Sequence, residues 1–166
     1  GPQVTREYFD APEHTRRGKI ADGDAVRHRM GDLGLVDERG RVWFCGRKAH
    51  RVATDDGVLF SVPCESVFNT HPRVARSALV GVRLAGRTEP VICVELDRET
   101  GRVDRRELER ELGELAAAHA HTRGIARFLV HRGFPVDIRH NSKIDRSCLA
   151  RWAAGRLGGE AAVVGS

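Results

Sequence analysis

The residue of this chain best suited to stabilising negative charge is Lys143. It lies in a polar segment, 134–146, that begins with a Phe-Pro pair. Only three of the 28 basic residues are lysine (Lys19, Lys48 and Lys143), and the rest are arginine. An ammonium is a compact point charge that fits between two oxygens, whereas a guanidinium is a flat fork. Lys143 is therefore a candidate for bridging two anionic groups, although a loop lysine is usually a solvated charge. An apolar stretch with Leu149 and Trp152 follows and predicts a helix.

Other familiar arrangements of catalytic groups do not occur in the sequence. It has no phosphate-binding glycine loop, no dinucleotide-binding glycine motif, no Gly-x-Ser-x-Gly and no His-Glu-x-x-His. The eight histidines are spread along the chain, and His119 and His121 form the one close pair. Side chains two positions apart on a helix point in different directions, so we predict no metal site. Residue types alone indicate a soluble α/β domain with one candidate lysine.

The composition favours a cytoplasmic protein that does not bind nucleic acid. A formal charge of +5 would permit binding to polyanions, but the arginines alternate with acidic residues and aromatic residues make up only 5%. The longest apolar runs, such as 77–82 and 91–96, are too short to span a bilayer, and we find no signal segment. The four cysteines form no Cys-x-x-Cys pair and are interpreted as reduced residues (Cys45, Cys64, Cys93 and Cys148).

Residues 1–46 are predicted to form strands and turns. Val26 to Met30 alternate in type, and the runs 33–37 and 41–45 flank Glu38-Arg39-Gly40 in a hairpin pattern. Because this block is too small to close a core alone, we interpret it as the edge of a larger β structure. A glycine and several charged residues then interrupt the pattern over 46–50, so we place a boundary there.

Residues 51–157 are predicted to form a small α/β domain with a mostly antiparallel sheet. Pro63 suits the first position of a helix that runs to about Thr70. Asp104 and Glu107 have the spacing of a capping box at the start of a second helix. We expect residues 158–166 to be disordered. The elements expected in order are a hairpin over 51–62, the first helix, strands over 75–84 and 90–96, the second helix with Leu108, Leu112, Leu115 and His119 on one face, a strand over 127–131, the lysine loop and a helix over 145–154.

Four segments together resemble the motifs of the adenylate-forming enzymes, which include acyl-CoA synthetases, the adenylation domains of peptide synthetases and luciferases. They follow the family's order: Gly1-Pro2-Gln3-Val4-Thr5 with Tyr8-Phe9 and Pro12-Glu13-x-Thr15, then Met30-Gly31-Asp32-Leu33-Gly34, then Asp37 and Gly40-Arg41 through Gly46-Arg47, then Asn141-Ser142-Lys143-Ile144-Asp145-Arg146. The segments 64–72 and 134–141 further resemble the β-lactone synthetases of long-chain olefin biosynthesis. The resemblance implies a fragment: the tail of a large N-terminal AMP-binding domain over 1–46, a hinge over 47–50, and a small C-terminal domain over 51–157.

The resemblance also implies roles for single residues. Lys143 matches the lysine that bridges the substrate carboxylate and the α-phosphate of ATP during adenylation. Asp32 matches the aspartate that accepts hydrogen bonds from the ribose hydroxyls, and Arg47 matches an arginine that contacts ribose or phosphate. Ala49, preceded by Lys48, stands at the hinge position where the family usually has Asp or Lys. Without the resemblance, Asp32 would be an ordinary turn residue and Arg47 a solvated charge.

The function that the resemblance implies is that of an ATP-dependent ligase. A long-chain β-hydroxy acid or fatty acid would be converted to its acyl-adenylate, and the hydroxyl of a β-hydroxy acid would then expel AMP to close a β-lactone. ATP and Mg²⁺ would be bound mainly by the N-terminal domain of the same enzyme. Two alternatives stay open: a fatty acyl-CoA ligase that takes CoA near Gly57, and a non-catalytic binding or interaction module.

Overall fold

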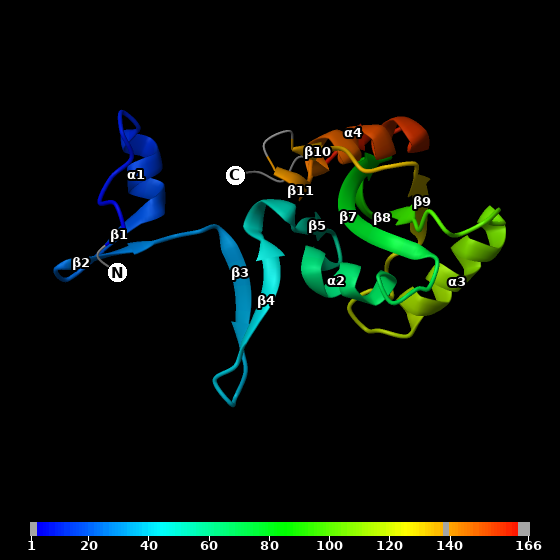
Figure 1. Ribbon diagram of the computed structural model, residues 1–166, viewed down its shortest axis with the longest axis horizontal. Helices are drawn as coiled ribbons and strands as arrows, with labels where there is room; N and C mark the ends of the chain where they lie inside the picture. Colours follow the sequence, from blue (N-terminus) through cyan, green and yellow to red (C-terminus); the bar gives the residue numbers. More distant parts are fainter. Residues whose placement is uncertain (1–2, 138–139, 163–166) are drawn as a thin grey trace.

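The computed structural model describes residues 3–137 and 140–162, without the side chains of 140–142. Figure 1 shows three successive parts: a helix with a small hairpin, a second hairpin that projects outward, and a compact unit that contains the rest of the chain. The residues predicted as a hinge run through a short 3₁₀ turn, η1 (Lys48–His50), at the start of the compact unit.

The first part contains a helix that the sequence analysis did not predict. Helix α1 (Pro12–Gly18) precedes the antiparallel pair β1 (Lys19–Asp22) and β2 (Ala25–His28). The prediction of strands and turns alone was therefore wrong over 12–18. Pro12 suits the first turn of a helix, and the Thr15 hydroxyl accepts from the Tyr8 backbone N–H at 2.9 Å and donates to the Ala11 carbonyl at 3.1 Å. These local bonds form the helix without burying any of its residues.

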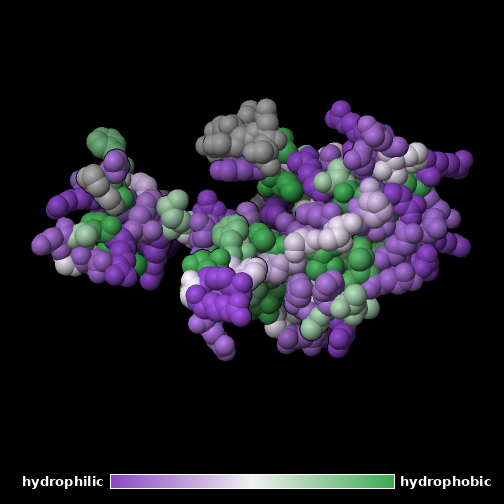
Figure 2. Space-filling model, turned by 60° about the horizontal axis from the view of Figure 1, so that its bottom comes forward, coloured by the Kyte–Doolittle hydropathy of each residue, from purple (hydrophilic) through white to green (hydrophobic). Residues whose placement is uncertain are grey.

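The hairpin predicted over 33–45 is confirmed as β3 (Asp32–Val36) paired with β4 (Val42–Arg47). The carboxylate of Asp37 holds its turn, because it accepts from the backbone N–H of Arg39 at 3.0 Å and of Arg41 at 2.9 Å. Several large apolar side chains of this hairpin remain exposed (Leu35, Val36, Val42, Trp43 and Phe44). Figure 2 shows such hydrophobic side chains reaching the surface near the middle of the molecule, while the outer surface is mostly hydrophilic.

The compact unit is built on a four-stranded sheet with the order β12-β7-β8-β9. The strands β7 (Val74–Leu84) and β8 (Arg87–Leu96) form a long antiparallel pair joined by Ala85 and Gly86, both with positive φ, as a tight two-residue hairpin turn requires. The strand β9 (Arg127–His131) runs parallel to β8. The predicted mostly antiparallel sheet is confirmed, and β8 begins three residues earlier than expected.

Helices cover both faces of this sheet. Side chains alternate across a strand, so Leu79 and Ile92 face α2 (Ser61–Phe68) and α3 (Arg105–Ala117), whereas Val80 and Val91 face α4 (Arg146–Leu157). Leu108, Leu112 and Phe68 complete one core; Leu149 and Ala153 belong to the other. Burying each large side chain contributes about 1.5–3 kcal/mol. The unit is held by two apolar layers, one on each side of the sheet.

The predicted helices begin within two residues of their expected positions, and α4 continues three residues beyond the predicted end at 154. Helix α2 begins at Ser61, so Pro63 is its third residue rather than its first. This costs no hydrogen bond, because the first four N–H groups of a helix lack intrahelical acceptors. Asp104 caps α3 as expected, accepting from the Arg106 N–H at 2.8 Å. The helix ends at Ala117, so the predicted apolar face does not extend to the exposed His119.

The short strands complete the unit. A small hairpin pairs β5 (Val52–Thr54) with β6 (Gly57–Leu59), and another pairs β10 (Val136–Asp137) with β11 (His140–Ile144). The prediction of a disordered tail was wrong for its first part, because β12 (Glu160–Ala161) pairs with β7. Residues 163–166 lie outside the described residues. In the described ranges, every helix is too short or too polar to cross a lipid bilayer.

Candidate functional site

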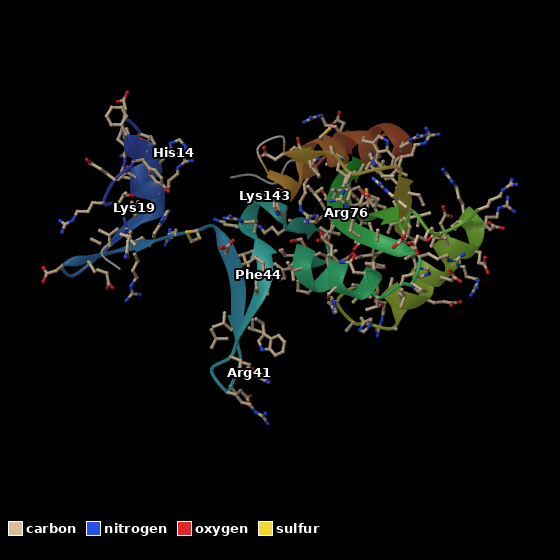
Figure 3. All side chains as sticks on the ribbon, in the orientation of Figure 1. His14, Lys19, Arg41, Phe44, Arg76 and Lys143 are labelled. Atoms are coloured by element: carbon tan, nitrogen blue, oxygen red, sulfur yellow. The ribbon has the colours of Figure 1, made fainter. Side chains whose placement is uncertain are left out.

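An open cleft of about 1130 Å³ lies where the chain passes from the β3–β4 hairpin into the compact unit. Its walls come from the end of β4 with Gly31, the η1 turn and the start of β5, the middle of β7, residues 161–162, and the β10–β11 hairpin with the start of α4. Figure 3 shows Lys143 on the side of the compact unit that faces the hairpin. The charged or titratable side chains of the lining are Arg47, Lys48, His50, Arg51, Asp137, Lys143, Asp145, Arg146 and Arg151.

Lys143 is exposed and belongs to a strand rather than to the predicted loop. Its strand is fixed directly after the lysine, because Ile144 pairs with Val136 and the Asp145 backbone N–H donates to the Pro135 carbonyl at 2.8 Å. The Asp145 carboxylate then caps α4 by accepting from the Cys148 N–H at 2.9 Å. These contacts hold the backbone next to Lys143 in place, although the lysine side chain itself is flexible.

Asp32 and Arg47 lie opposite each other on β3 and β4. Arg47 Nε is 3.2 Å from Asp32 Oδ1, and the same guanidinium donates to the Met30 carbonyl. The two side chains are 40% and 45% exposed, so solvent or a ligand can reach both. The structure thus brings Asp32 next to Arg47, and Arg47 into the same cleft as Lys143, Lys48 and Ala49; Asp32 does not itself line the cleft.

The charge of the cleft is predominantly positive. Six lysine and arginine side chains line it against two aspartates. Burial, followed by the positive charges of Arg146 and Arg47, lowers the pKa of His50, so its imidazole is neutral at pH 7. Cations gathered in a concave, partly buried surface attract anions. Chemically, the cleft can bind a phosphate or carboxylate group and place an ammonium beside it.

One ion pair, whose arginine lines the cleft and whose carboxylate lies behind it, was not singled out from the sequence. Arg146 holds both carboxylate oxygens of Glu65, with Nη1–Oε1 at 2.6 Å and Nη2–Oε2 at 2.9 Å. Arg146 ends the segment that carries Lys143, so its presence there was visible. Its partner lies 81 residues earlier on α2, and no local pattern could have identified it.

The described residues bring together no group of three or more His, Cys, Asp or Glu side chains that could hold a metal ion. The lining of the cleft agrees with this, since its two carboxylates stand among six cations. The two carboxylates of the lining, Asp137 and Asp145, are by themselves too few to hold a metal ion without further ligands.

The similarity of this chain to known proteins is extensive. No family model matches it. It is 53% identical over 159 residues to the olefin β-lactone synthetase of Xanthomonas campestris pv. campestris, an alignment covering 93% of this chain and 29% of that protein. It is 51% identical over 162 residues to the olefin β-lactone synthetase of Stenotrophomonas maltophilia, with 95% and 29% covered. The chain thus spans under a third of the length of these relatives.

Solved structures show the same fold. The ATP-bound RpMatB-BxBclM chimera B1 matches with a TM-score of 0.72 and 26% identity over 90% of this chain and 28% of that one. The anthranilate CoA ligase AuaEII in complex with anthranoyl-AMP matches with a TM-score of 0.76 at 20% identity over 92% of this chain and 28% of that one, a likeness of fold alone. The chain belongs to the adenylate-forming superfamily, as its motifs indicated. Within that superfamily it is homologous to the olefin β-lactone synthetases, of which it corresponds to less than a third.

Proposed function

We propose that this chain is the C-terminal part of an ATP-dependent ligase that adenylates a long-chain β-hydroxy acid and closes the product to a β-lactone. The observation that carries the proposal is the similarity to two olefin β-lactone synthetases over nearly the whole chain. The cationic cleft supports it independently, because adenylation brings together two anions that repel each other. On this proposal, residues 51–157 form the small C-terminal domain and 1–46 the tail of the large one.

In the first step, a carboxylate oxygen of the acid attacks the α-phosphorus of ATP, and pyrophosphate leaves. Lys143 would place its ammonium between the carboxylate and the α-phosphate, which offsets their repulsion and stabilises the charge that develops in the transition state. Arg47, in the same cleft, would contact the nucleotide. The Asp32 carboxylate has oxygen lone pairs that can accept hydrogen bonds from both ribose hydroxyls, provided that Arg47 releases the Asp32 oxygen that it now contacts.

In the second step, the β-hydroxyl oxygen attacks the acyl carbon of the acyl-adenylate. AMP leaves with the bonding electrons, the hydroxyl proton is lost, and a four-membered lactone remains. The sum of both steps removes one water from the acid. Because the acid already carries its nucleophile, no thiol is required. This second step does not need an ammonium between two anions, so we assign Lys143 to the first step only.

The rest of the same enzyme is the expected partner of this chain. The exposed apolar side chains of β3 and β4 support this, because a hairpin with such a surface is typical of a sheet edge that packs against further structure. Mg²⁺ accompanying ATP would be bound by that missing part. We expect the enzyme to be cytoplasmic, in keeping with four free cysteines. We also expect residues 1–166 alone to fold without catalysing adenylation.

The test is mass spectrometry of the products that the full-length enzyme forms from ATP, Mg²⁺ and a long-chain 3-hydroxy acid, with and without CoA. The expected product forms without CoA, is lighter than the acid by one water, and appears with stoichiometric AMP. A thioester that appears only with CoA would replace the proposal with a fatty acyl-CoA ligase. Binding without turnover of either kind would instead indicate an interaction module.

A further inference from the structure

We propose that Glu65 and Arg146 are positioning residues for the adenylation step, which they serve by fixing the strand that carries Lys143. The proposal rests on the proposed function, because it takes Lys143 as the lysine of that step. Neither residue touches the reacting groups in this account. They affect the rate by setting the position of the Lys143 backbone, from which the lysine side chain extends.

The pair joins three elements at one point. Glu65 comes from α2, Arg146 is the first residue of α4, and Leu79 lies on β7 between them. The Leu79 backbone N–H donates to Glu65 Oε1 at 2.8 Å, and Arg146 Nη1 donates to the Leu79 carbonyl at 3.2 Å. One carboxylate and one guanidinium therefore satisfy each other and both backbone groups of a central strand residue.

Burial makes this junction specific. The side chains of Glu65 and Arg146 are only 11% and 16% exposed, so a charge left without its partner at this junction is poorly hydrated. The planar fork of arginine matches a carboxylate with two parallel bonds, a geometry that a lysine cannot reproduce. The position of Arg146 is thus set relative to α2 and β7 in distance and in direction.

Lys143 stands three residues before Arg146 on a backbone with little freedom. Ile144 is paired with Val136, the Asp145 N–H is bound to the Pro135 carbonyl, and Arg146 is bound to Glu65. Without the last of these, the β11–α4 junction loses its two-pronged tie to α2 and keeps the small β10–β11 hairpin, the single hydrogen bond from Arg146 to the Leu79 carbonyl and the packing of α4. A shift of the reacting groups by about 1 Å typically costs about 10²-fold in rate, so loosening this anchor should slow adenylation measurably.

The experiment uses the full-length enzyme and two separate assays: ATP–pyrophosphate exchange for adenylation, and lactone formation from a preformed acyl-adenylate for the second step. Glu65→Gln keeps the shape of the side chain but removes its charge. We expect it to lower the kcat of adenylation by about 10- to 100-fold, with the KM for ATP changed by less than about threefold. Closure of the preformed acyl-adenylate should be unchanged.

The decisive comparison is the same substitution in a Lys143→Ala background. If Glu65 acts through Lys143, Glu65→Gln should produce no further loss of adenylation there; losses that multiply would overturn the proposal. Glu111→Gln is the matched control, because Glu111 also pairs with an arginine and a histidine in this unit but lies away from the lysine segment. An equal loss of adenylation in the Glu111→Gln enzyme would show that Glu65 supports only the stability of the unit and does not position Lys143.

Two further outcomes are distinguishable. If Glu65→Gln fails to fold, Arg146→Lys carries the test, since it keeps the charge but loses the two-pronged contact; a normal adenylation rate in a folded Arg146→Lys enzyme would refute the positioning role. If Lys143→Ala itself adenylates normally, the assignment of Lys143 fails, and the proposed function is then judged separately by its product.

Discussion

Replacing Gly46 with alanine should selectively slow adenylation, because this glycine lies where β4 meets α2. Its φ of +108° is a backbone conformation that glycine adopts and other residues rarely do. A Cβ atom at this position would overlap the Ser61 hydroxyl and lie 3.4 Å from Val62 Cγ2. Arg47 follows directly, so the same contact sets how the end of β4 faces the cleft that holds Lys143.

The size of the effect follows from two contributions. A non-glycine residue in such a backbone conformation costs about 1–3 kcal/mol. The overlap with Ser61 adds to this cost, although rotation of the short Ser61 side chain relieves part of it. If the substitution destabilises the packing of β4 on α2 by about 2 kcal/mol relative to other arrangements of these two elements, the adenylation that depends on this packing slows by about 30-fold.

ATP–pyrophosphate exchange by the full-length enzyme measures this loss, and closure of a preformed acyl-adenylate serves as the internal reference. Gly40→Ala is the matched control, since Gly40 has a φ of +73° but no atom within 4 Å of the added Cβ. That variant should adenylate within about twofold of the wild type, because its strain stays in the turn of the hairpin. A Gly46→Ala enzyme that adenylates normally would show that close packing of β4 on α2 is not needed for the reaction.

Two further predictions concern charged side chains. Lys143→Ala should slow adenylation by about 10²–10³-fold and leave the melting temperature unchanged, because the side chain is exposed; an unaltered exchange rate would remove Lys143 from the mechanism. The hydrogen bond from His71, assisted by that from Arg73, lowers the pKa of Glu111 from its ordinary value of 4.5. The folded state therefore binds fewer protons than the unfolded state, and this part of the stability is present above that ordinary value and disappears as the pH falls through the lowered one. Urea unfolding of residues 1–166 from about pH 6 to about pH 3 should show a shallower acid-side decline in Glu111→Gln, and identical slopes would contradict the assignment.

Local features of the sequence sufficed for much of the compact unit. The long strands carry continuous apolar runs, the β3–β4 hairpin has its turn residues, and Asp104 has the spacing of a helix cap; the structure confirms each. These signals depend on neighbours within a few positions, and so they are readable without the fold. The motifs that indicated an adenylate-forming enzyme are likewise short, and the comparison with relatives confirms that family.

Where local signals were weak or balanced, the prediction failed. The seven residues of α1 bury none of their side chains and carry no apolar periodicity to detect. The strand β12 is only two residues long and owes its form to the edge of β7, which offers it unpaired backbone groups. Both α1 and β12 depend on hydrogen bonds that cannot be predicted from the amino-acid composition of these two segments.

Sequence alone thus identified Lys143, Asp32 and Arg47 by type and motif, and their roles in catalysis remain predictions for the experiments above. Only the folded chain shows that Arg47 and Lys143, 96 positions apart, line one cleft, and that Glu65 anchors Arg146 across 81 residues. The physical reason is that contacts between distant segments depend on how helices pack on a sheet. That packing is set by the summed burial of two apolar layers, and no single stretch of sequence contains it.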